Sequence, residues 1–450
     1  MTLTSRSVAG REGVRMLALV AGSVLTVVGA AAPAPTAAGD TPRTGDLSLT
    51  EVGRMRQPRA GAAAVRLADG RVLIVGGTSG ERNDDGDTRM VLDTAEVFDP
   101  ASGTWADAGT MAVPRANAAA AALPDGRVLV TGGRPIPTHA HDPMGSSTSE
   151  IWDPATGDFS PTGPMLQGRS GHTATTLSDG RVLVIGGIGL VEEGSDLGQF
   201  EARTTHGAKV SAGSLRSAEV WTDGSFTTAG SMIGTRANHV AVLLPGDRVL
   251  VAGGYSEVGS SRGGRGGIVS SVEVSVGPDT GFGVVGSPPG YLRASGGVLL
   301  PDGRVVLCCL SGDDEVAQLV IYLPGDMATT RMRAPDGWGR GSLVALPDGR
   351  ILAAWGSESD QRDGQPVWGV DALDLSTGIV NTVVPDDVAA SGDRGTDTER
   401  RVWDGSGVLV GLGEGQVLMA GGHVLSGLGT EAGQASSDHA YVITTDPDGR

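Results

Sequence analysis

The sequence predicts an all-β fold, a seven-bladed β-propeller whose last blade is closed by an N-terminal strand. Three observations predict it: a turn-and-strand unit returns seven times, each unit holds short strand patterns separated by turn residues, and Gly accounts for 73 of the 450 residues. Short strands at regular spacing are typical of closed all-β architectures, and a unit of about 50 residues with four strands is a propeller blade. We expect one propeller over residues 40–450, with units at roughly 56–111, 112–165, 166–232, 233–289, 290–334, 335–384 and 400–450.

The unit centres on a turn, usually Asp-Gly, and an apolar strand that ends in two glycines in five of the copies, with weaker copies at Pro301 and Pro347. The first copy runs from Ala68 to Gly77. Gly accepts a positive φ without a Cβ clash, so Asp-Gly predicts a tight hairpin between strand a, before the turn, and strand b, after it. One polar residue after the turn marks the copies, 46 to 67 residues apart: Arg71, Arg127, Arg181, Arg248, Arg304, Arg350 and Gln416.

The other strands of each unit follow from the same pattern. Strand a is small and apolar, as in Ala60–Leu67, and in a propeller it lies nearest the axis, where larger side chains would overpack. Strand c follows strand b, as in Ala95–Phe98. Strand d begins near an aromatic residue at Trp105 or Phe159.

The two ends of the chain predict how the ring closes. The last unit ends with a strand c, His439–Thr444, and an orphan strand at Leu47–Val52, followed by Met55, matches the strand d at Trp105–Met111. We therefore expect residues 45–55 to complete the last blade, which removes two open sheet edges.

These units resemble the kelch-repeat β-propeller family. The resemblance rests on the four-strand unit, on the aromatic residue that opens strand d, and on the paired glycines at 76–77, 132–133, 186–187, 253–254 and 421–422. It implies the fold, but kelch propellers include both enzymes and binding scaffolds.

Within that family the chain is similar to the central propeller of the galactose oxidase type, without its copper-site motif. In galactose oxidase-like enzymes the copper site includes a Tyr that is followed by His. Here no tyrosine is followed by His, which speaks against copper-radical oxidation; the four are Tyr255, Tyr291, Tyr322 and Tyr441.

The first 39 residues read as a secretory signal peptide. Arg6, Arg11 and Arg15 precede an apolar run at 16–32, and small residues follow through Gly39. A transmembrane anchor is the alternative, although the run is shorter than the about 20 residues that a bilayer needs. We expect a secreted, extracellular protein with no membrane contact after cleavage.

The net charge limits the classes of partner that the protein can bind, and the two cysteines leave their oxidation state open. The formal net charge is −18, which argues against nucleic acid because a basic face is needed to neutralise phosphates. The adjacent Cys308 and Cys309 are the only cysteines, and the sequence leaves open a vicinal disulfide or two buried thiols. We expect a monomer.

One face of the disc is the candidate binding face. The a–b and c–d turns are short, whereas the b–c connections are long and irregular and share the opposite face, the loop face, with the d–a connections. Arginines recur in the d–a connections and could bind carboxylates or acidic sugars; they are Arg59, Arg115, Arg169, Arg236 and Arg293. Alternatively, each bonds blade carbonyls or pairs with a strand-c glutamate: Glu96, Glu150, Glu219 or Glu273.

Histidines fall into two groups. His172 and His239 each follow such an arginine by three positions, and we expect structural roles for them. The loop-face histidines are candidate ligand-binding residues: His139, His141, His206 and His423. His139 and His141 could start a metal site with a third ligand from His206 or His423, or simply be solvated, and we expect no metal or other cofactor.

The function that we expect is a non-catalytic scaffold that binds a glycan or an extracellular protein through the loop face. The sequence contains no complete catalytic set, so enzyme activity is left uncertain. The alternative is a carbohydrate-active enzyme, an oxidase, lyase or hydrolase, on a galactose oxidase-like propeller.

Overall fold

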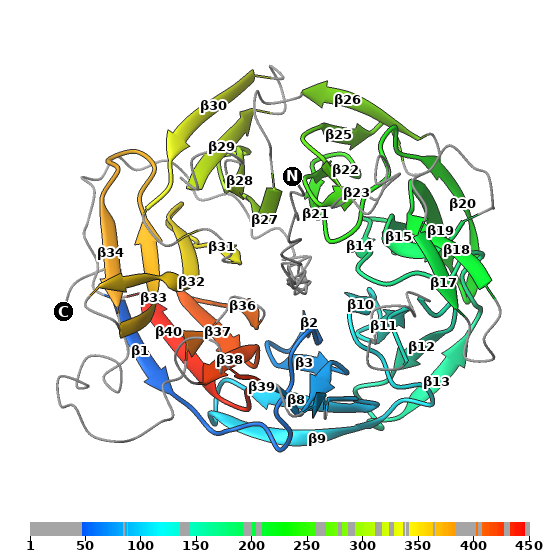
Figure 1. Cartoon of the computed structure of the whole chain (residues 1–450), viewed down its shortest axis with the longest axis horizontal. Coiled ribbons are helices and arrows are strands. Elements are labelled where there is room, and N and C mark those ends of the chain that lie inside the picture. The colour runs from blue at the N-terminus through cyan, green and yellow to red at the C-terminus, as the bar shows by residue number, and fades with distance from the viewer. Residues whose placement is uncertain are drawn as a thin grey trace, which may run out of the picture.

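Seven four-stranded antiparallel sheets form a ring, and each sheet runs outward from the axis (Figure 1). The computed structural model describes residues 47–83, 86–87, 89–135, 145–191, 200–203, 209–256, 267–277, 281–286, 293–310, 317–323, 328–335, 338, 342–362, 365–383, 402–403, 407–426 and 433–445. These residues contain no α-helix, and none of their segments is a helix long and apolar enough to cross a membrane. The predicted fold class, a seven-bladed propeller, is confirmed.

The first three blades follow the chain in order. Their strands, from axis to rim, are β2 (Ala63–Arg66), β3 (Val72–Val75), β8 (Thr94–Asp99) and β9 (Thr104–Thr110) in blade 1; β10 (Ala119–Ala122), β11 (Val128–Thr131), β12 (Ser149–Trp152) and β13 (Phe159–Thr162) in blade 2; and β14 (Thr173–Thr176), β15 (Val182–Ile185), β19 (Ser217–Thr222) and β20 (Ser225–Ser231) in blade 3.

Blades 4–6 repeat the arrangement. Their strands are β21 (Val240–Leu244), β22 (Arg248–Ala252), β25 (Val272–Ser275) and β26 (Phe282–Gly286) in blade 4; β27 (Arg293–Leu299), β28 (Val305–Leu310), β29 (Ala317–Leu323) and β30 (Ala328–Arg333) in blade 5; and β31 (Leu343–Ala345), β32 (Ile351–Arg362), β33 (Gln365–Leu373) and β34 (Val380–Val383) in blade 6.

Blade 7 is built from both ends of the described chain. β36 (Val408–Gly413), β37 (Gln416–Ala420) and β40 (Ala440–Thr445) are completed at the rim by β1 (Leu47–Glu51), which pairs antiparallel with β40 from Leu47↔Thr445 to Glu51↔Tyr441. The predicted closure by an N-terminal strand is therefore confirmed. The predicted signal peptide, residues 1–39, lies outside the described residues.

The Asp-Gly turns adopt the expected hairpin geometry. In blade 1, Gly70 has φ +91°, and the Asp69 carboxylate accepts from Arg71 N (3.0 Å) and Arg71 Nε (2.7 Å). The same pair of bonds forms at Arg127, Arg181, Arg304 and Arg350. In these five blades the repeat arginine thus has a local role: it stabilises the turn that precedes strand b.

Apolar residues pack between neighbouring blades rather than within single ones. One cluster joins Val65, Leu73 and Val97 of blade 1 to Val130 and Trp152 of blade 2, all buried. Each blade is stabilised by the next, so the ring is one cooperative unit.

The b–c connections of blades 1, 3, 4 and 7 contain strands, which corrects the expectation that they are irregular, and one further strand, Val402–Trp403, lies in the d–a connection that leads into blade 7. The added strands form small sheets: β16 (Ile188–Leu190), β18 (Lys209–Ser214) and β17 (Phe200–Arg203); β23 (Tyr255–Ser256) with β24 (Gly267–Ile268); β4 (Thr78–Ser79) with β7 (Met90–Val91); and β35 (Val402–Trp403), β38 (His423–Ser426), β39 (Gly433–Ser436), β5 (Glu81–Asn83) and β6 (Gly86–Asp87). In the last sheet the connection of blade 7 pairs with that of blade 1, through Gln434↔Arg82 and Ala435↔Glu81.

Candidate functional site

The arginine of the d–a connection lies buried inside each of blades 1–4. In blade 2 the Arg115 guanidinium donates from Nη1 to Gly132 O (2.7 Å) and Thr148 O (2.9 Å), and from Nη2 to Thr148 Oγ1 (2.8 Å) and Glu150 Oε1 (2.9 Å). The Arg115 and Glu150 side chains are 0% and 3% exposed. Equivalent buried ion pairs join Arg59 to Glu96 (2.7 Å), Arg169 to Glu219 (2.6 Å) and Arg236 to Glu273 (2.5 Å).

Two backbone N–H groups complete the shell of each glutamate. Glu150 accepts from Ala112 N (2.8 Å) and Val113 N (3.3 Å), which lie on the same d–a connection as Arg115. Both oxygens of the buried carboxylate are therefore bonded to N–H donors, as a buried charge requires. The unit of one arginine, one strand-c glutamate and two backbone N–H groups is here called the Arg–Glu node.

Burial lowers the pKa of Arg59, Arg115, Arg169 and Arg236, and the paired glutamates partly offset this effect. Both Nη atoms of Arg115 are used inside the blade, so a ligand carboxylate would have to displace Glu150 or backbone carbonyls. The structure thus gives these four arginines the architectural role that the sequence offers as the alternative. For Arg293 the structure describes only the backbone, at the start of β27, and Val320 stands at the glutamate position of blade 5.

The paired glycines join each blade to the next in this part of the ring. The second glycine donates its N–H to the carbonyl of the next blade's arginine, in Gly77→Arg115 (2.8 Å), Gly133→Arg169 (2.9 Å), Gly187→Arg236 (2.9 Å) and Gly422→Arg59 (2.9 Å). The first glycine packs against a buried methionine four residues before that arginine; these are Met55, Met111, Met165 and Met232. The Met-x-x-x-Arg spacing was a signal that could have identified the joint from sequence.

A chain of backbone hydrogen bonds links the same blades on the loop face. Asn117 N donates to Gly61 O (3.0 Å), Gly171 N to Asn117 O (2.9 Å), and Asn238 N to Gly171 O (2.8 Å). All four residues have positive φ between 50° and 62°. These bonds therefore join the d–a connections of blades 1–4 to one another on the loop face.

His172 and His239 are structural, as expected. His172 Nε2 lies 2.8 Å from Thr131 Oγ1 of blade 2, and His239 Nε2 lies 3.1 Å from Thr173 Oγ1 of blade 3. Burial, followed by the positive charge of Arg236, lowers the pKa of His239 to about 3. Burial also lowers the pKa of His172 well below its usual value.

This depressed pKa predicts a loss of stability in acid. The folded state resists protonation of His239, while the unfolded chain takes up a proton near pH 6.5, so stability falls as the pH drops from 6.5 toward 3. At pH 5 the loss from this residue is about 2 kcal/mol. Urea unfolding at pH 7 and pH 5 measures it, and His239→Gln, which keeps a polar atom near the Nε2 position, is expected to show a smaller drop. An equal drop in wild type and variant would contradict this assignment.

The remaining candidate residues do not assemble into a site within the described residues. His423 is buried in β38 on the loop face, whereas His139, His141 and His206 lie outside the described residues. Among the residues that the structure describes, no group of three His, Cys, Asp or Glu could hold a metal ion.

The strand that contains Cys308 and Cys309 bears on whether they form a vicinal disulfide or remain thiols. Cys308 is a buried thiol that donates to Trp338 O at 3.3 Å. β28 continues unbroken through both cysteines, with Cys308↔Leu319 and Cys309↔Gln318 in register. A vicinal disulfide would break this strand, so the structure favours a free thiol at Cys308.

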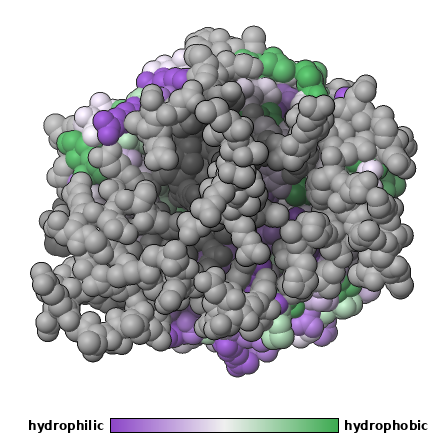
Figure 2. Space-filling model, in the orientation of Figure 1, coloured by the Kyte–Doolittle hydropathy of each residue, from purple (hydrophilic) through white to green (hydrophobic). Residues whose placement is uncertain are grey.

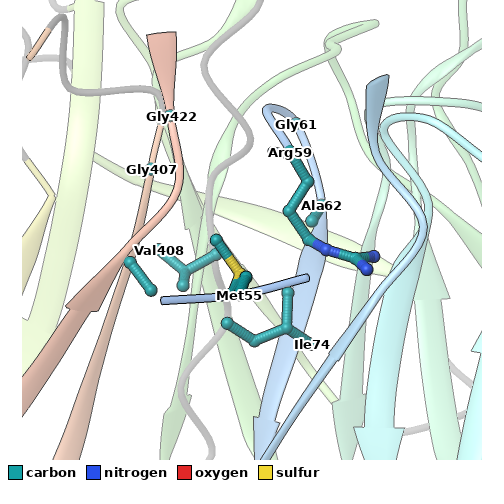
Figure 3. Close-up of a pocket in the computed structure, with 9 residues that line it drawn as sticks. Met55, Arg59, Gly61, Ala62, Ile74, Gly407, Val408 and Gly422 are labelled. Atoms are coloured by element: carbon teal, nitrogen blue, oxygen red, sulfur yellow. The ribbon is translucent and has the colours of Figure 1, made fainter. Parts of the chain in front are cut away.

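A narrow recess lies at the joint between blade 7 and blade 1, where Met55 fills the space between Val408 and Ile74 (Figure 3). The Arg59 side chain points away from this recess, into blade 1 (Figure 3). The recess leaves no room for a water-sized sphere, so it does not serve as a small-molecule pocket.

Exposed apolar side chains on the loop face escaped the sequence analysis. Leu166 and Ile233 occupy equivalent d–a positions and are 62% and 60% exposed, while their backbone N–H groups bond Glu219 and Glu273. Met90 in β7 and Leu190 in β16 are also exposed. Leu166 and Ile233 could have been found from their positions in the sequence, because they stand three residues before Arg169 and Arg236, directly after a buried methionine.

Comparison with known proteins supports the architecture. Residues 58–112, which span blade 1, match the family model described as the Kelch motif. No curated protein matches the chain. The matched motif in blade 1 and the seven four-stranded blades support the similarity of this chain to the kelch-repeat β-propeller family.

Proposed function

We propose that the protein is a secreted, non-catalytic scaffold that binds an extracellular protein or glycan through its loop face. Kelch-repeat propellers are generally protein-binding scaffolds. The observation that carries the proposal is the asymmetry of the disc. The turns on one face are tight hairpins, and the connections on the other face are elaborated into added β-sheets above a frame of bonded blades.

The exposed side chains of that face favour a protein partner. Leu166, Ile233 and Met90 are each at least 60% exposed, and burying apolar surface is the main source of affinity between proteins. Exposed apolar residues occur elsewhere too: hydrophobic surface lies over β26 at the rim of the disc in Figure 2. Val276, at the c–d turn of the same blade and so on the opposite face, is 69% exposed. Val276 therefore offers a matched control.

Binding is tested with the double variant Leu166→Ser/Ile233→Ser and the control Val276→Ser. The immobilised full chain is incubated with the secreted proteins of its own culture and, separately, with a glycan array. For any ligand recovered and purified, the double variant is expected to weaken the Kd at least about tenfold, since two exposed apolar anchors are removed, and the control to leave it unchanged. Equal affinity of all three proteins, or weakening by Val276→Ser alone, would place the binding surface elsewhere.

Secretion is tested separately, because a failed export and a failed interaction are different outcomes. The full chain is produced in a secreting host, and the N-terminus of the protein in the medium is sequenced. A mature chain that begins directly after Ala38 or Gly39 supports the signal-peptide interpretation. A chain that stays in the membrane fraction with Met1 intact would support the transmembrane alternative.

A further inference from the structure

Blade 6 contains a buried carboxylate that breaks the pattern of blades 1–4. In blade 1, Glu96 pairs with Ile74, and Ile74 lies three residues after the repeat arginine, Arg71. In blade 6, Asp371 pairs with Ala353, and Ala353 likewise lies three residues after Arg350. Asp371 therefore occupies the glutamate position of an Arg–Glu node, and it is 2% exposed. Its partners differ: the Trp338 indole donates from Nε1 to Asp371 Oδ2 (2.7 Å), and Thr382 Oγ1 donates to Asp371 Oδ1 (2.7 Å).

The groups around Asp371 supply no cation among the described residues. Thr382 faces it from β34, Trp338 from the segment that leads into β31, and Trp355 from β32, and all three are uncharged. The nearby titratable group on a neighbouring blade is the Cys308 thiol of β28, which bonds the carbonyl of Trp338. Among the described residues, therefore, no cation compensates this buried carboxylate, and Arg340 of the same connection lies outside them.

The chemistry of the partners decides which carboxyl groups can take up a proton. The Glu96 oxygens accept from Arg59 Nη2, Arg56 N and Gln57 N, and none of these N–H groups can become an acceptor. A threonine hydroxyl can donate or accept. When Asp371 is protonated on Oδ1, this O–H would therefore donate a hydrogen bond to Thr382 Oγ1, and the threonine hydroxyl would turn its own hydrogen toward solvent. Oδ2 would still accept from Trp338 Nε1.

We infer that Asp371, Thr382 and Trp338 form a proton-binding joint in blade 6, which contributes more stability when the buried carboxyl group is protonated in acid than when it is ionised at neutral pH. Thr382 is exposed, so the proton reaches the carboxyl group through its hydroxyl. Trp338 is fully buried and belongs to the d–a connection on the loop face, so its anchoring sets how firmly that connection is seated. Protonation thus acts on the face that we propose for binding, although the joint does not depend on that function.

The sign of the effect follows from the direction of the shift. Burial raises the pKa of Asp371 above its ordinary value. A carboxyl group with a raised pKa in the folded state contributes stability that is present below the unfolded pKa, about 3.9, and is lost as the pH rises through the folded pKa. The glutamates of the Arg–Glu nodes are each paired with a buried arginine, so a node serves as an internal control.

The test compares Asp371→Asn with Glu150→Gln, the matched carboxamide change in blade 2. The Tm of Asp371→Asn relative to wild type is expected to rise between pH 4 and pH 8, by on the order of 2 °C, because the variant removes a charge that is uncompensated only at the higher pH. Glu150→Gln is expected to lower the Tm at pH 8, because Arg115 loses its counter-charge. An Asp371→Asn variant that is destabilised equally at every pH would overturn the inference.

A second readout does not depend on the stability of the variant. The fluorescence of Trp338, taken as the difference between wild type and Trp338→Phe, is expected to shift between pH 4 and pH 8 as the charge next to its indole changes. Thr382→Val removes a hydroxyl that donates to the ionised carboxylate and lowers the pKa of Asp371, so it is expected to move the midpoint of this shift to higher pH. A Trp338 signal that does not change over this range, or a midpoint that Thr382→Val leaves in place, would overturn the inference.

Discussion

Replacement of Arg115 by methionine is expected to destabilise the protein by about 3–5 kcal/mol, the usual cost of removing one partner of a buried ion pair. Methionine retains much of the apolar stem but none of the four bonds that the guanidinium makes. Glu150, 2% exposed, would keep two backbone N–H partners but lose its counter-charge, and Gly132 O and Thr148 O would lose donors. Denaturant unfolding followed by tryptophan fluorescence measures the change.

Arg127→Met in the same blade is the matched control. Arg127 also pairs with a carboxylate, Asp125, at 2.6 Å, but the two side chains are 43% and 49% exposed. Exposed pairs contribute about 0–1 kcal/mol, so this variant should remain close to wild type. Similar small losses in both variants would mean that the buried node is not a stabilising element and would reopen a ligand-binding role for Arg115.

The repeat was readable from sequence because its structural causes are local. The Asp-Gly turn, the arginine that bonds its aspartate and the apolar strand that follows lie within ten residues, so each copy carries its own signal. The closing strand was predictable for a related reason: Leu47–Glu51 has the strand-d pattern without a blade of its own.

The role of the arginines could not be decided from sequence, because it depends on register. Arg59 lies 37 residues from Glu96, and the two meet only when strand c pairs with strand b so that Glu96 stands opposite Ile74. The sequence could name both residues and both roles, but the choice between them required the sheet.

The added sheets of the loop face were missed for a longer-range reason. Gln434 pairs with Arg82 across most of the chain, and this pairing exists only because ring closure brings blade 7 beside blade 1. Neither segment has the alternating pattern of a half-buried strand. In blade 6 the sequence offers Arg340 as a near-equivalent of the repeat arginine, but Trp338 stands twelve residues before Arg350, and only the register shows that Asp371 occupies the glutamate position.

The joint between blades predicts the second large effect, at the first glycine of each pair. Gly132→Ala is expected to destabilise the protein by more than about 3 kcal/mol, from two causes that add. Gly132 has φ +61°, which costs a residue with a Cβ about 1–3 kcal/mol. Its Cβ would also lie 2.6 Å from His172 Cε1 and still closer to Arg169 O, a backbone atom of the next blade. The blades would have to separate to admit it, and the bond from Gly133 N to Arg169 O would be weakened.

Gly126→Ala in the turn of the same blade separates the two causes. Gly126 has φ +91°, but a Cβ there meets nothing within 4 Å, so only the conformational cost applies. The difference between the two variants in free energy of unfolding, measured in denaturant, therefore reports the close approach of blade 3 to blade 2. If Gly132→Ala cost no more than Gly126→Ala, the paired glycines would be needed only for their backbone angles, and the tight contact between blades would not be what fixes them.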